Sequence, residues 1–330
     1  MQNNLFAGTL PIQGSDVAAQ WDMLYWFLFW LSAFFFVLVV GAMIVFAVKY
    51  RHSKVGTKTK YLTGSHALEG VFVVVPTILL MVIFFWGYKV YRNMVTAPAD
   101  SYEIRVIAKQ WLWQFLYENG KVTVGDVYVP LNKPVKFIMT SEDVLHSFFV
   151  PSFRVKQDVV PGMYTSVWFE AKVPGKHNIF CAEYCGTSHS GMLGKVNVLT
   201  EPQWKDWLKG KEIADSGQSA SDGGKKKSGK NSGGGMVEKG KGYFATKGCV
   251  ACHSADGSKL IGPTLQGVYG SKVDLADGST ALADDNYMKE SIENPTAKVV
   301  KGFAPTMPPF KGILTEQEIT ALIAYIRSLK

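Results

Sequence analysis

Two long apolar blocks near the start of the chain place the first constraint on its fold. They cover residues 24–48 and 68–88, and each matches or exceeds the roughly 20 residues that a helix needs to cross a bilayer. Glu69 is the only charged residue within them. We therefore expect residues 1–96 to form an N-terminal segment and a two-helix transmembrane hairpin, with spans at about 24–48 and 68–90.

The basic residues are placed so that they orient this hairpin. The formal net charge is +8, and residues 1–96 hold seven Lys or Arg against three Asp or Glu. Five of those seven lie at positions 49–60, between the two blocks. The positive-inside rule places that loop in the cytoplasm. We expect a multi-pass protein of a bacterial inner membrane with both termini on the periplasmic side, and no binding to nucleic acid.

Residues 97–209 are expected to form a β domain. Short alternating segments occur at residues 102–107, 135–139, 166–170 and 195–199, as in strands with one buried face. Turn signals such as Pro161-Gly162 separate them. This pattern predicts an antiparallel sandwich or barrel.

The remaining residues divide into a tether and a helical domain. Residues 210–235 are rich in Gly, Ser and Lys, so they cannot bury a core and are expected to be a flexible linker. Residues 236–330 are predicted to be helical. One helix is expected at residues 285–293. Another begins after Thr315, which opens a capping box with Glu318.

A soft-ligand cluster lies near the end of the β domain. Cys181, Cys185, His189 and Met192 occur within twelve residues, and this set suits copper. A mononuclear electron-transfer site uses two His, one Cys and a weak Met, so the run has one thiol too many and one imidazole too few. His146 could supply the second imidazole, and two thiolates could bridge two coppers.

The cysteine pair is also compatible with two different arrangements. One is a Cys181–Cys185 disulfide, and the second is a copper chaperone that uses a Cys pair and a distant His. The remaining histidines at positions 52, 66 and 177 lack a comparable setting, and loop or surface roles are expected for them.

A second signature lies in the helical domain. Cys249-Val-Ala-Cys252-His253 is the attachment pattern of a c-type haem, although zinc and redox sites use similar strings. His253 would be the proximal ligand of the iron. Of the two later methionines, Met288 falls in the helix expected at residues 285–293, where packing is the expected role.

The copper cluster carries a family resemblance. Residues 181–192, with His146 upstream, resemble the dinuclear copper A site of cytochrome c oxidase subunit II, whose domain is cupredoxin-like. The resemblance implies that both cysteines bridge two coppers, that each His binds one, and that Met192 binds weakly. It also implies that the Glu183 carbonyl binds copper. The Glu183 carboxylate would bind magnesium at the border with subunit I.

The haem motif carries a second resemblance. The segment from Ile261, Ile-Gly-Pro-Thr-Leu-Gln-Gly-Val-Tyr-Gly, resembles the loop behind the proximal histidine in class I cytochromes c. The resemblance implies thioether bonds from Cys249 and Cys252 and a second iron ligand at Met307. Ligation by Met raises the haem potential relative to two imidazoles.

Two further residues gain roles from the subunit II resemblance. Gln110-Trp-Leu-Trp-Gln-Phe resembles the aromatic segment of that family, which implies that Trp111 receives electrons at the surface. Glu69 matches a glutamate at the cytoplasmic mouth of a proton path into subunit I. An ionisable group at that depth is by default a functional candidate.

The resemblances together imply a terminal respiratory oxidase subunit of the aa type with a fused cytochrome c. Electrons would pass from haem c to copper A and on to haem a of subunit I, where oxygen is reduced to water with proton translocation. Subunits I and III are the expected partners, with cytochrome c or a quinol–cytochrome c reductase upstream. The alternatives are a copper A subunit of a nitric oxide reductase and a membrane-anchored electron shuttle. A quinol oxidase subunit would lack the copper ligands.

Overall fold

The computed structural model describes residues 9–51, 63–211 and 235–329. The chain divides into two compact units, one formed by Asp16–Thr96 and the other by Ala97–Lys330 together with Met1–Ser15. The expected linker at residues 210–235 lies almost wholly outside the described residues, as does most of the basic loop at positions 49–60.

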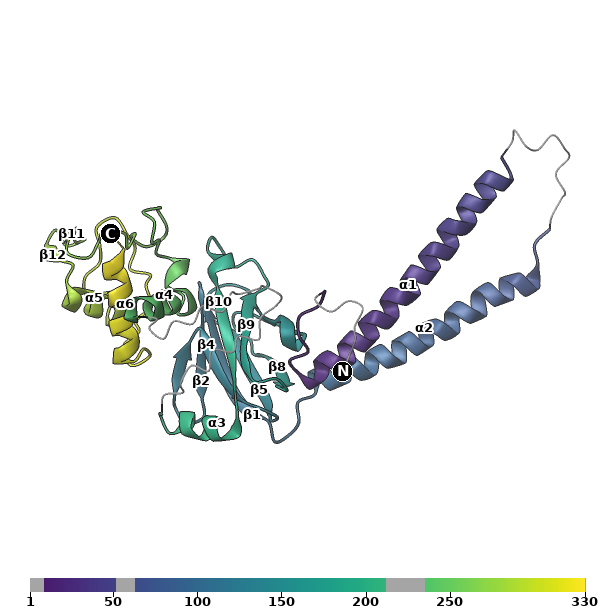
Figure 1. Cartoon of the computed structure of the whole chain (residues 1–330), viewed down its shortest axis with the longest axis horizontal. Coiled ribbons are helices and arrows are strands. Elements are labelled where there is room, and N and C mark those ends of the chain that lie inside the picture. The colour runs from purple at the N-terminus through teal and green to yellow at the C-terminus, as the bar shows by residue number, and fades with distance from the viewer. Residues whose placement is uncertain (1–8, 52–62, 212–234, 330) are drawn as a thin grey trace. The chain divides into compact units, whose positions relative to one another are not determined.

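The first unit is a pair of long apolar helices, α1 (Asp16–Lys49) and α2 (His66–Val95) (Figure 1). Their most apolar stretches have mean hydropathies of 2.8 and 2.5, and none of the residues in those stretches is buried. Both helices extend beyond the expected spans. Asp16 lies in the first turn of α1, where its charge complements the helix dipole. Helices of this length and composition are able to cross a bilayer.

Two five-stranded sheets form the sandwich domain, which comprises the described residues 97–211 (Figure 1). One sheet has the order β3-β2-β1-β5-β8 and the other β4-β10-β9-β6-β7. The strands are β1 (Tyr102–Lys109), β2 (Leu112–Tyr117), β3 (Val122–Val124), β4 (Asp126–Pro130), β5 (Pro134–Ser141), β6 (His146–Val150), β7 (Val155–Val159), β8 (Thr165–Glu170), β9 (Gly175–Cys181) and β10 (Leu193–Leu199). Short helices η2 (Pro151–Phe153), η3 (His189–Gly191) and α3 (Glu201–Leu208) complete it.

The sandwich core confirms the expected β domain but corrects its pairing. Along β5, buried and half-buried positions alternate, because successive side chains point to opposite faces. Rings from both sheets meet in the core: Phe137 and Phe169 of one sheet pack near Phe148 of the other. The sheets are not wholly antiparallel, since β1 pairs with β5 and β4 with β10 in parallel.

A short stretch before α1 belongs to the sandwich domain, although residues 1–96 were expected to group together. Gly14 donates from its backbone N to the Ser152 carbonyl over 2.8 Å and accepts from Lys172 over the same distance. A Cβ on Gly14 would lie 2.6 Å from the Phe153 ring, so only glycine fits. The stretch thus joins the sandwich immediately before the membrane helix begins.

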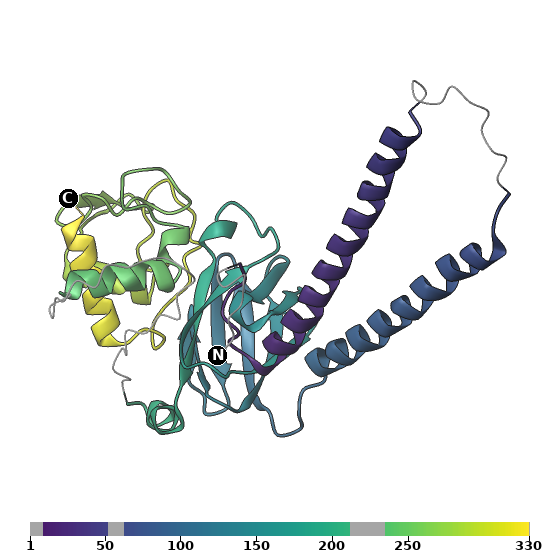
Figure 2. The same cartoon turned by 45° about the vertical axis from the view of Figure 1, so that its right-hand side comes forward.

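The C-terminal domain, residues 235–329, is built around two crossing helices (Figure 2). Its elements are α4 (Met236–Thr246), η4 (Cys249–Ala251), β11 (Lys272–Asp274), β12 (Thr280–Leu282), α5 (Asp285–Glu293) and α6 (Glu316–Ser328). At the crossing, a Cβ on Gly240 would lie 1.9 Å from the Ala321 carbonyl oxygen. The expected helices and the capping box at Thr315 are confirmed, and the β11–β12 ribbon is an addition to them.

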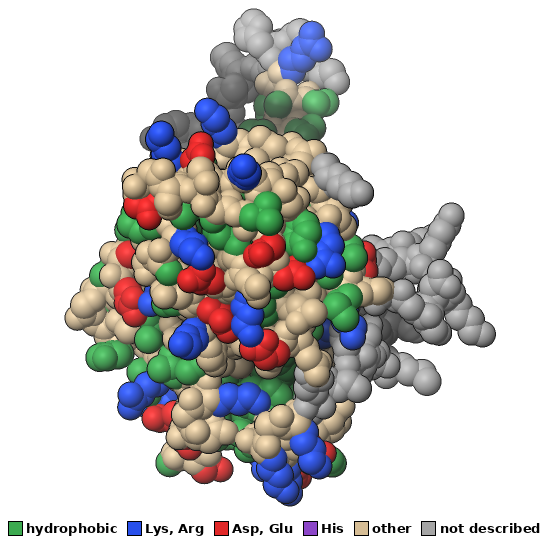
Figure 3. Space-filling view, turned by 90° about the vertical axis from the view of Figure 1, so that its left-hand side faces the viewer, with side chains coloured by type: hydrophobic (Ala, Val, Ile, Leu, Met, Phe, Trp, Pro, Cys, Tyr) green, Lys and Arg blue, Asp and Glu red, His purple; other side chains and the backbone are tan. Residues whose placement is uncertain are grey.

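Ion pairs cover the outside of the C-terminal domain. Lys289 pairs with Glu316 at 2.7 Å and Lys298 with Glu290 at 2.6 Å. Figure 3 shows basic and acidic side chains interspersed on this face. Exposed pairs of this kind contribute little to stability, and their mixture leaves the face shown without a large field of one sign.

Candidate metal centres

The soft ligands of the sandwich domain meet at one point. The Cys181 and Cys185 sulfurs are 3.6 Å apart, well beyond the roughly 2.05 Å of a disulfide, and both thiols are free. Nδ1 of His146 lies 3.9 Å from Cys181 Sγ, and Nδ1 of His189 lies 3.4 Å from Cys185 Sγ. Met192 Sδ is 3.9 Å from Cys185 Sγ. The side chains of His146, His189 and Met192 thus surround the two cysteine sulfurs.

Strand ends bring these ligands together. His146 opens β6 and Cys181 closes β9, and the two strands are neighbours in one sheet. Cys185 and His189 follow in the loop before β10. The Glu183 carbonyl also reaches the cluster, with its oxygen 3.3 Å from Cys181 Sγ. Two soft thiolates with two imidazoles, a thioether and a carbonyl form a donor set that fits copper.

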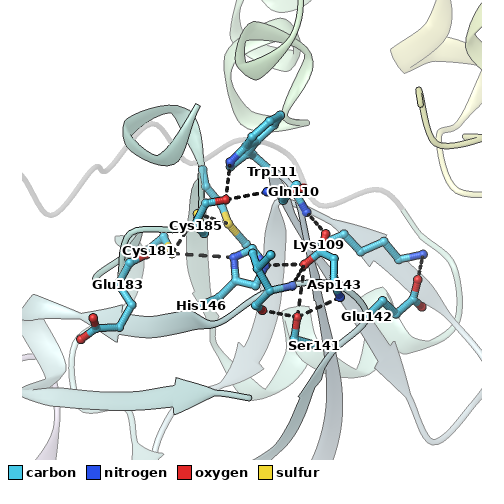
Figure 4. Close-up of polar contacts among 12 residues, drawn as sticks. Lys109, Gln110, Trp111, Ser141, Glu142, Asp143, His146, Cys181, Glu183 and Cys185 are labelled. Carbon is cyan, nitrogen blue, oxygen red and sulfur yellow. Dashed lines mark hydrogen bonds and ion pairs between the residues drawn. The ribbon is translucent and has the colours of Figure 1, made fainter. Parts of the chain in front are cut away.

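Asp143 fixes the orientation of His146 (Figure 4). Its carboxylate lies 2.8 Å from Nε2 of His146, and it accepts from the backbone N–H groups of Gln110 and Val144, each over 2.6 Å. With Nε2 donating to the carboxylate, Nδ1 keeps its lone pair and faces Cys181. Burial opposes the charged form of Asp143, but these bonds prevail and lower its pKa.

The two thiols differ in acidity. Burial disfavours the Cys181 thiolate, but the contacts with His146 and the Ser147 backbone outweigh it and lower the pKa of Cys181 to about 7. Burial and the neighbouring Cys181 charge raise the pKa of Cys185 to about 12. Two adjacent thiolates repel each other without a cation between them, so a metal must displace the Cys185 proton.

Trp111 lies directly on the cluster. Its indole Nε1 donates to the Cys185 carbonyl over 3.1 Å, and Nε2 of Gln110 donates to the same oxygen over 2.8 Å (Figure 4). A Cβ on Gly186 would lie 2.8 Å from the Gln110 amide and 2.9 Å from the Trp111 ring, so this glycine permits the close approach. The sequence pattern did not predict these roles of Gln110 and Asp143. The spacing of Asp143, three residues before a ligand histidine, was the available signal.

The Glu183 side chain points away from the sulfurs (Figure 4). Its carboxylate pairs with Lys156 at 3.1 Å, and the same ammonium pairs with Asp158 at 3.1 Å. The Glu183 carbonyl therefore faces the cluster. Its carboxylate lies at a separate, partly exposed site, where it and Asp158 both pair with the Lys156 ammonium.

The haem signature lines a cavity of about 240 Å³ that is formed mostly by the C-terminal domain and, on one side, by Gln110, Trp111 and Leu112. Cys249, Cys252, His253 and Met307 all line it, among mostly apolar side chains. Nδ1 of His253 lies 2.8 Å from the Pro263 carbonyl oxygen, so Nδ1 carries the proton and Nε2 is left free for iron. Burial lowers the pKa of His253, which keeps the ring neutral. The apolar lining and this free nitrogen suit a haem.

Met288 and Met307 both reach this cavity. Met288 lies in α5, as expected, and is 5% exposed within the apolar core. Met307 lies in the loop between α5 and α6, packed against the same core. Because Met307 lies on a loop, helix packing does not fix the direction of its thioether as it does for Met288.

The other residues with predicted roles lie elsewhere. Glu69 is in the first turn of α2, and its carboxylate is 3.2 Å from Nδ1 of His66. The expectation of a loop or surface role for His177 is wrong, because that ring is 2% exposed. Nδ1 of His177 lies 3.0 Å from Ser152 Oγ, and its Nε2 is 3.0 Å from the Val173 carbonyl. Residue 52 lies outside the described residues.

Two family models match separate parts of the chain: the periplasmic domain of cytochrome c oxidase subunit II at residues 83–198 and cytochrome c at residues 237–330. Cytochrome c oxidase subunit 2 of Alkalihalophilus pseudofirmus is 30% identical over 311 residues, which cover 89% of this chain and 84% of that relative. Alternative cytochrome c oxidase subunit 2 of Bradyrhizobium diazoefficiens is 31% identical over 54% of this chain and 76% of its own. A crystal structure of the periplasmic domain of subunit II of cytochrome oxidase from Bradyrhizobium japonicum is 27% identical, with a TM-score of 0.34, and covers 35% of this chain and 96% of that one.

Proposed function

Because the chain belongs to the cytochrome c oxidase subunit 2 family, we propose that it carries electrons from a donor through a haem c to a dinuclear copper A centre. From there they continue to haem a of subunit I, where oxygen is reduced to water with proton translocation. Family membership itself makes the chain a membrane-anchored subunit of a haem–copper oxidase, associated with subunit I. The two matching family models also mean that the chain contains a copper A domain and a haem-binding domain.

The arrangement of ligands around two sulfurs carries the proposal. The 3.6 Å between the Cys181 and Cys185 sulfurs lets both thiolates contact two metals at once. His146 and His189 approach different cysteines, so each imidazole would bind a different copper. Met192 and the Glu183 carbonyl would complete the set as weak ligands. Bound copper and haem supply one-electron redox chemistry.

The C-terminal domain contributes the second centre. Cys249 and Cys252 would attach the haem through thioethers, His253 would bind the iron through Nε2, and Met307 would supply the second iron ligand. The Pro263 carbonyl, 2.8 Å from Nδ1 of His253, supports this assignment because it fixes the tautomer.

Trp111 would pass electrons to the copper site. Its hydrogen bond to the Cys185 carbonyl supports this role, because it joins the ring to the backbone of a bridging ligand. The remaining assignments follow the family. The Glu183 carboxylate would bind magnesium at the border with subunit I. The ion pair between Lys156 and Glu183 would then have to break. Glu69 would open a proton path.

The expected setting is the inner membrane of a bacterium, with both termini on the periplasmic side. Subunit III and an upstream cytochrome c or quinol–cytochrome c reductase would complete the path. The basic loop at positions 49–60 supports this orientation through the positive-inside rule.

A direct test is electron paramagnetic resonance on the complex purified from membranes, with copper and haem analysis and oxygen consumption. We expect one unpaired electron shared by two equivalent copper nuclei, one covalent haem c per chain, and oxygen uptake. Cys185→Ser should remove the copper signal and keep the haem, whereas Cys252→Ala should weaken haem attachment and keep the copper signal. A single-copper spectrum would refute the dinuclear centre. Reduction of nitric oxide instead of oxygen, or purification without a haem–copper partner, would favour the nitric oxide reductase or the shuttle.

A further inference from the structure

The five residues before the first membrane helix, 11–15, cross the edge of the sandwich domain, and we call them the strap. Ser15 forms an antiparallel bridge with Ala171, directly after β8, and its hydroxyl donates to the Phe153 carbonyl over 2.9 Å. β8 is the edge strand of one sheet, and Phe153 lies just before β7, the edge strand of the other. The strap therefore contacts the chain beside the edge strands of both sheets.

Gly14 makes the closest contact of the strap. Its N–H donates to the Ser152 carbonyl and its own carbonyl accepts from Lys172, each over 2.8 Å. A Cβ on Gly14 would lie 2.6 Å from the ring of Phe153, which has no exposed surface and packs on His177 with 4.6 Å between ring centroids. A ring enclosed in a close-packed core has little room to move aside. The strap thus fits its site only with glycine at this position.

The side chain of Arg154 holds the other end of the strap. Its Nη2 donates to the Pro11 carbonyl over 2.6 Å, and its Nη1 donates to the Pro151 carbonyl over 2.6 Å. Nη1 also lies 3.5 Å from the Ile12 carbonyl oxygen. A guanidinium carries several donors in fixed directions, so one side chain can join the strap to the η2 segment of the sandwich domain.

The backbone of Arg154 supports this role. It is left-handed, with φ 57° and ψ 29°, a conformation that is unfavourable for a residue with a Cβ and that glycine adopts readily. Two of the three carbonyl contacts of the guanidinium, those to Pro11 and Ile12, require the strap. The strained backbone position is therefore occupied by a side chain that binds the strap.

The strap ends where the membrane helices begin, because α1 starts at Asp16. The sandwich domain is thus joined to the helix pair α1 and α2 at two places, by residues 97–101 after α2 and by the strap before α1. A domain that is attached through a single connection is expected to move relative to its neighbour. We propose that the strap is a second attachment, held by Arg154, that limits rotation of the sandwich domain relative to the membrane helices.

The strap has a consequence for the copper site. β6 begins at the proposed ligand His146 and leads directly into η2, which the strap holds. A metal site on paired strands moves with its sheet, so the strap would keep the copper ligands at a constant orientation to α1 and α2. Only this consequence rests on the proposed function, since no residue of the strap is a proposed metal ligand.

Hydrogen–deuterium exchange on the full chain with its cofactors, in lipid nanodiscs, tests the strap without relying on activity. Arg154→Lys keeps the charge and the backbone strain but loses the forked donors. Arg105→Lys, at an exposed position of β1, is the matched control. Peptides covering residues 10–16 and 170–174 should exchange about tenfold faster in Arg154→Lys, which corresponds to about 1.4 kcal/mol, and at the original rate in Arg105→Lys. Equal exchange in the two variants would overturn the proposal.

A second pair of variants tests the contact from the side of the strap. Gly14→Ala directs a methyl group at the Phe153 ring and should speed exchange in the same peptides. The control is Gly235→Ala, because neither glycine has a left-handed backbone and a Cβ on Gly235 meets nothing within 4 Å. Unchanged protection of residues 10–16 in Gly14→Ala would also count against the strap.

Pulsed electron paramagnetic resonance measures the restraint itself. Two nitroxides would be attached to keto amino acids at the exposed positions Lys49, at the end of α1, and Lys205, on α3, so that no cysteine is introduced. We expect a narrow distance distribution in the otherwise unchanged chain and a broader one in Arg154→Lys. Equal widths alongside faster exchange would retain the contact and refute its restraining role. A narrow distribution in a chain without copper would count against the proposed function and support the strap.

Discussion

The two metal-binding regions of this chain are built in opposite ways. In the sandwich domain, strand ends that are already paired hold the ligands, and Asp143 fixes His146 from behind. In the C-terminal domain, a cavity of about 240 Å³ lies where a core would otherwise be packed. Paired strand ends and Asp143 therefore hold the proposed copper ligands in place, whereas a haem would pack directly among the core side chains of its domain.

The packing of the two cores agrees with this difference. The sandwich core contains large side chains with no exposed surface, such as Trp113, Phe115 and Phe137, and none of these three is a metal ligand. In the C-terminal domain, the core residues Phe310, Leu322 and Ile326 line the cavity itself. Loss of the cofactor should thus affect the two domains unequally.

The largest expected effect comes from preventing haem attachment. In a chain carrying Cys249→Ser and Cys252→Ser, the apolar side chains that line the cavity would lack the haem they pack against. Leaving several of them without a packing partner should cost several kcal/mol, which is comparable to the whole stability of a small domain. Calorimetry should show the C-terminal transition lost and the sandwich transition kept. The matched chain with Cys181→Ser and Cys185→Ser should keep both transitions, and a cooperative haem-free C-terminal domain would contradict the comparison.

A smaller effect is expected at the crossing of α4 and α6. Gly240→Ala places a methyl group 1.9 Å from the Ala321 carbonyl, so the helices must separate, at a cost of about 3 kcal/mol. The control, Gly242→Ala, lies on the same helix with nothing within 4 Å and should stabilise the helix by up to about 1 kcal/mol. Thermal melts of the holo chain measure both. Similar melting temperatures for Gly240→Ala and Gly242→Ala would show that α4 and α6 can move apart at little cost.

The third effect concerns the copper site alone. Asp143→Asn should weaken copper binding by about 10- to 100-fold, because the carboxylate that orients His146 is lost. Competition titration with a copper chelator measures the affinity. Glu142→Gln is the control, since Glu142 pairs with Lys109 on the surface at 2.7 Å and should leave the affinity unchanged. Equal affinities in the two variants would mean that the strand ends alone organise the site.

Local spacing explains what could be predicted from the sequence. The proposed copper ligands from Cys181 to Met192 and the haem motif at Cys249 each occupy a short stretch of sequence, so their spacing is itself the signal. The helix at residues 285–293 and the capping box at Thr315 could be predicted for the same reason, because each depends on residues close together in the sequence. The structure brings His146 to the cluster because β6 and β9 are neighbours.

Features that depend on contacts between distant segments could not be predicted in the same way. Asp143 and Gln110 meet only because the turn after β1 lies beside the loop before β6. The parallel pairing of β1 with β5 depends on a crossover that alternation of side chains does not encode. The burial of His177 depends on Ser152 and Phe153, more than twenty residues earlier. Lys247 of the C-terminal domain is 5% exposed, with its ammonium 3.9 Å from Asp126 of the sandwich domain.

The most direct test of the central claim is time-resolved absorbance on the purified full-length chain carrying both cofactors. After rapid photoreduction of the haem, we predict that haem oxidation and copper reduction proceed at one rate that does not depend on protein concentration. A rate proportional to concentration, or a haem that stays reduced beside oxidised copper, would contradict the account, because the two centres would then not form one path within a single chain.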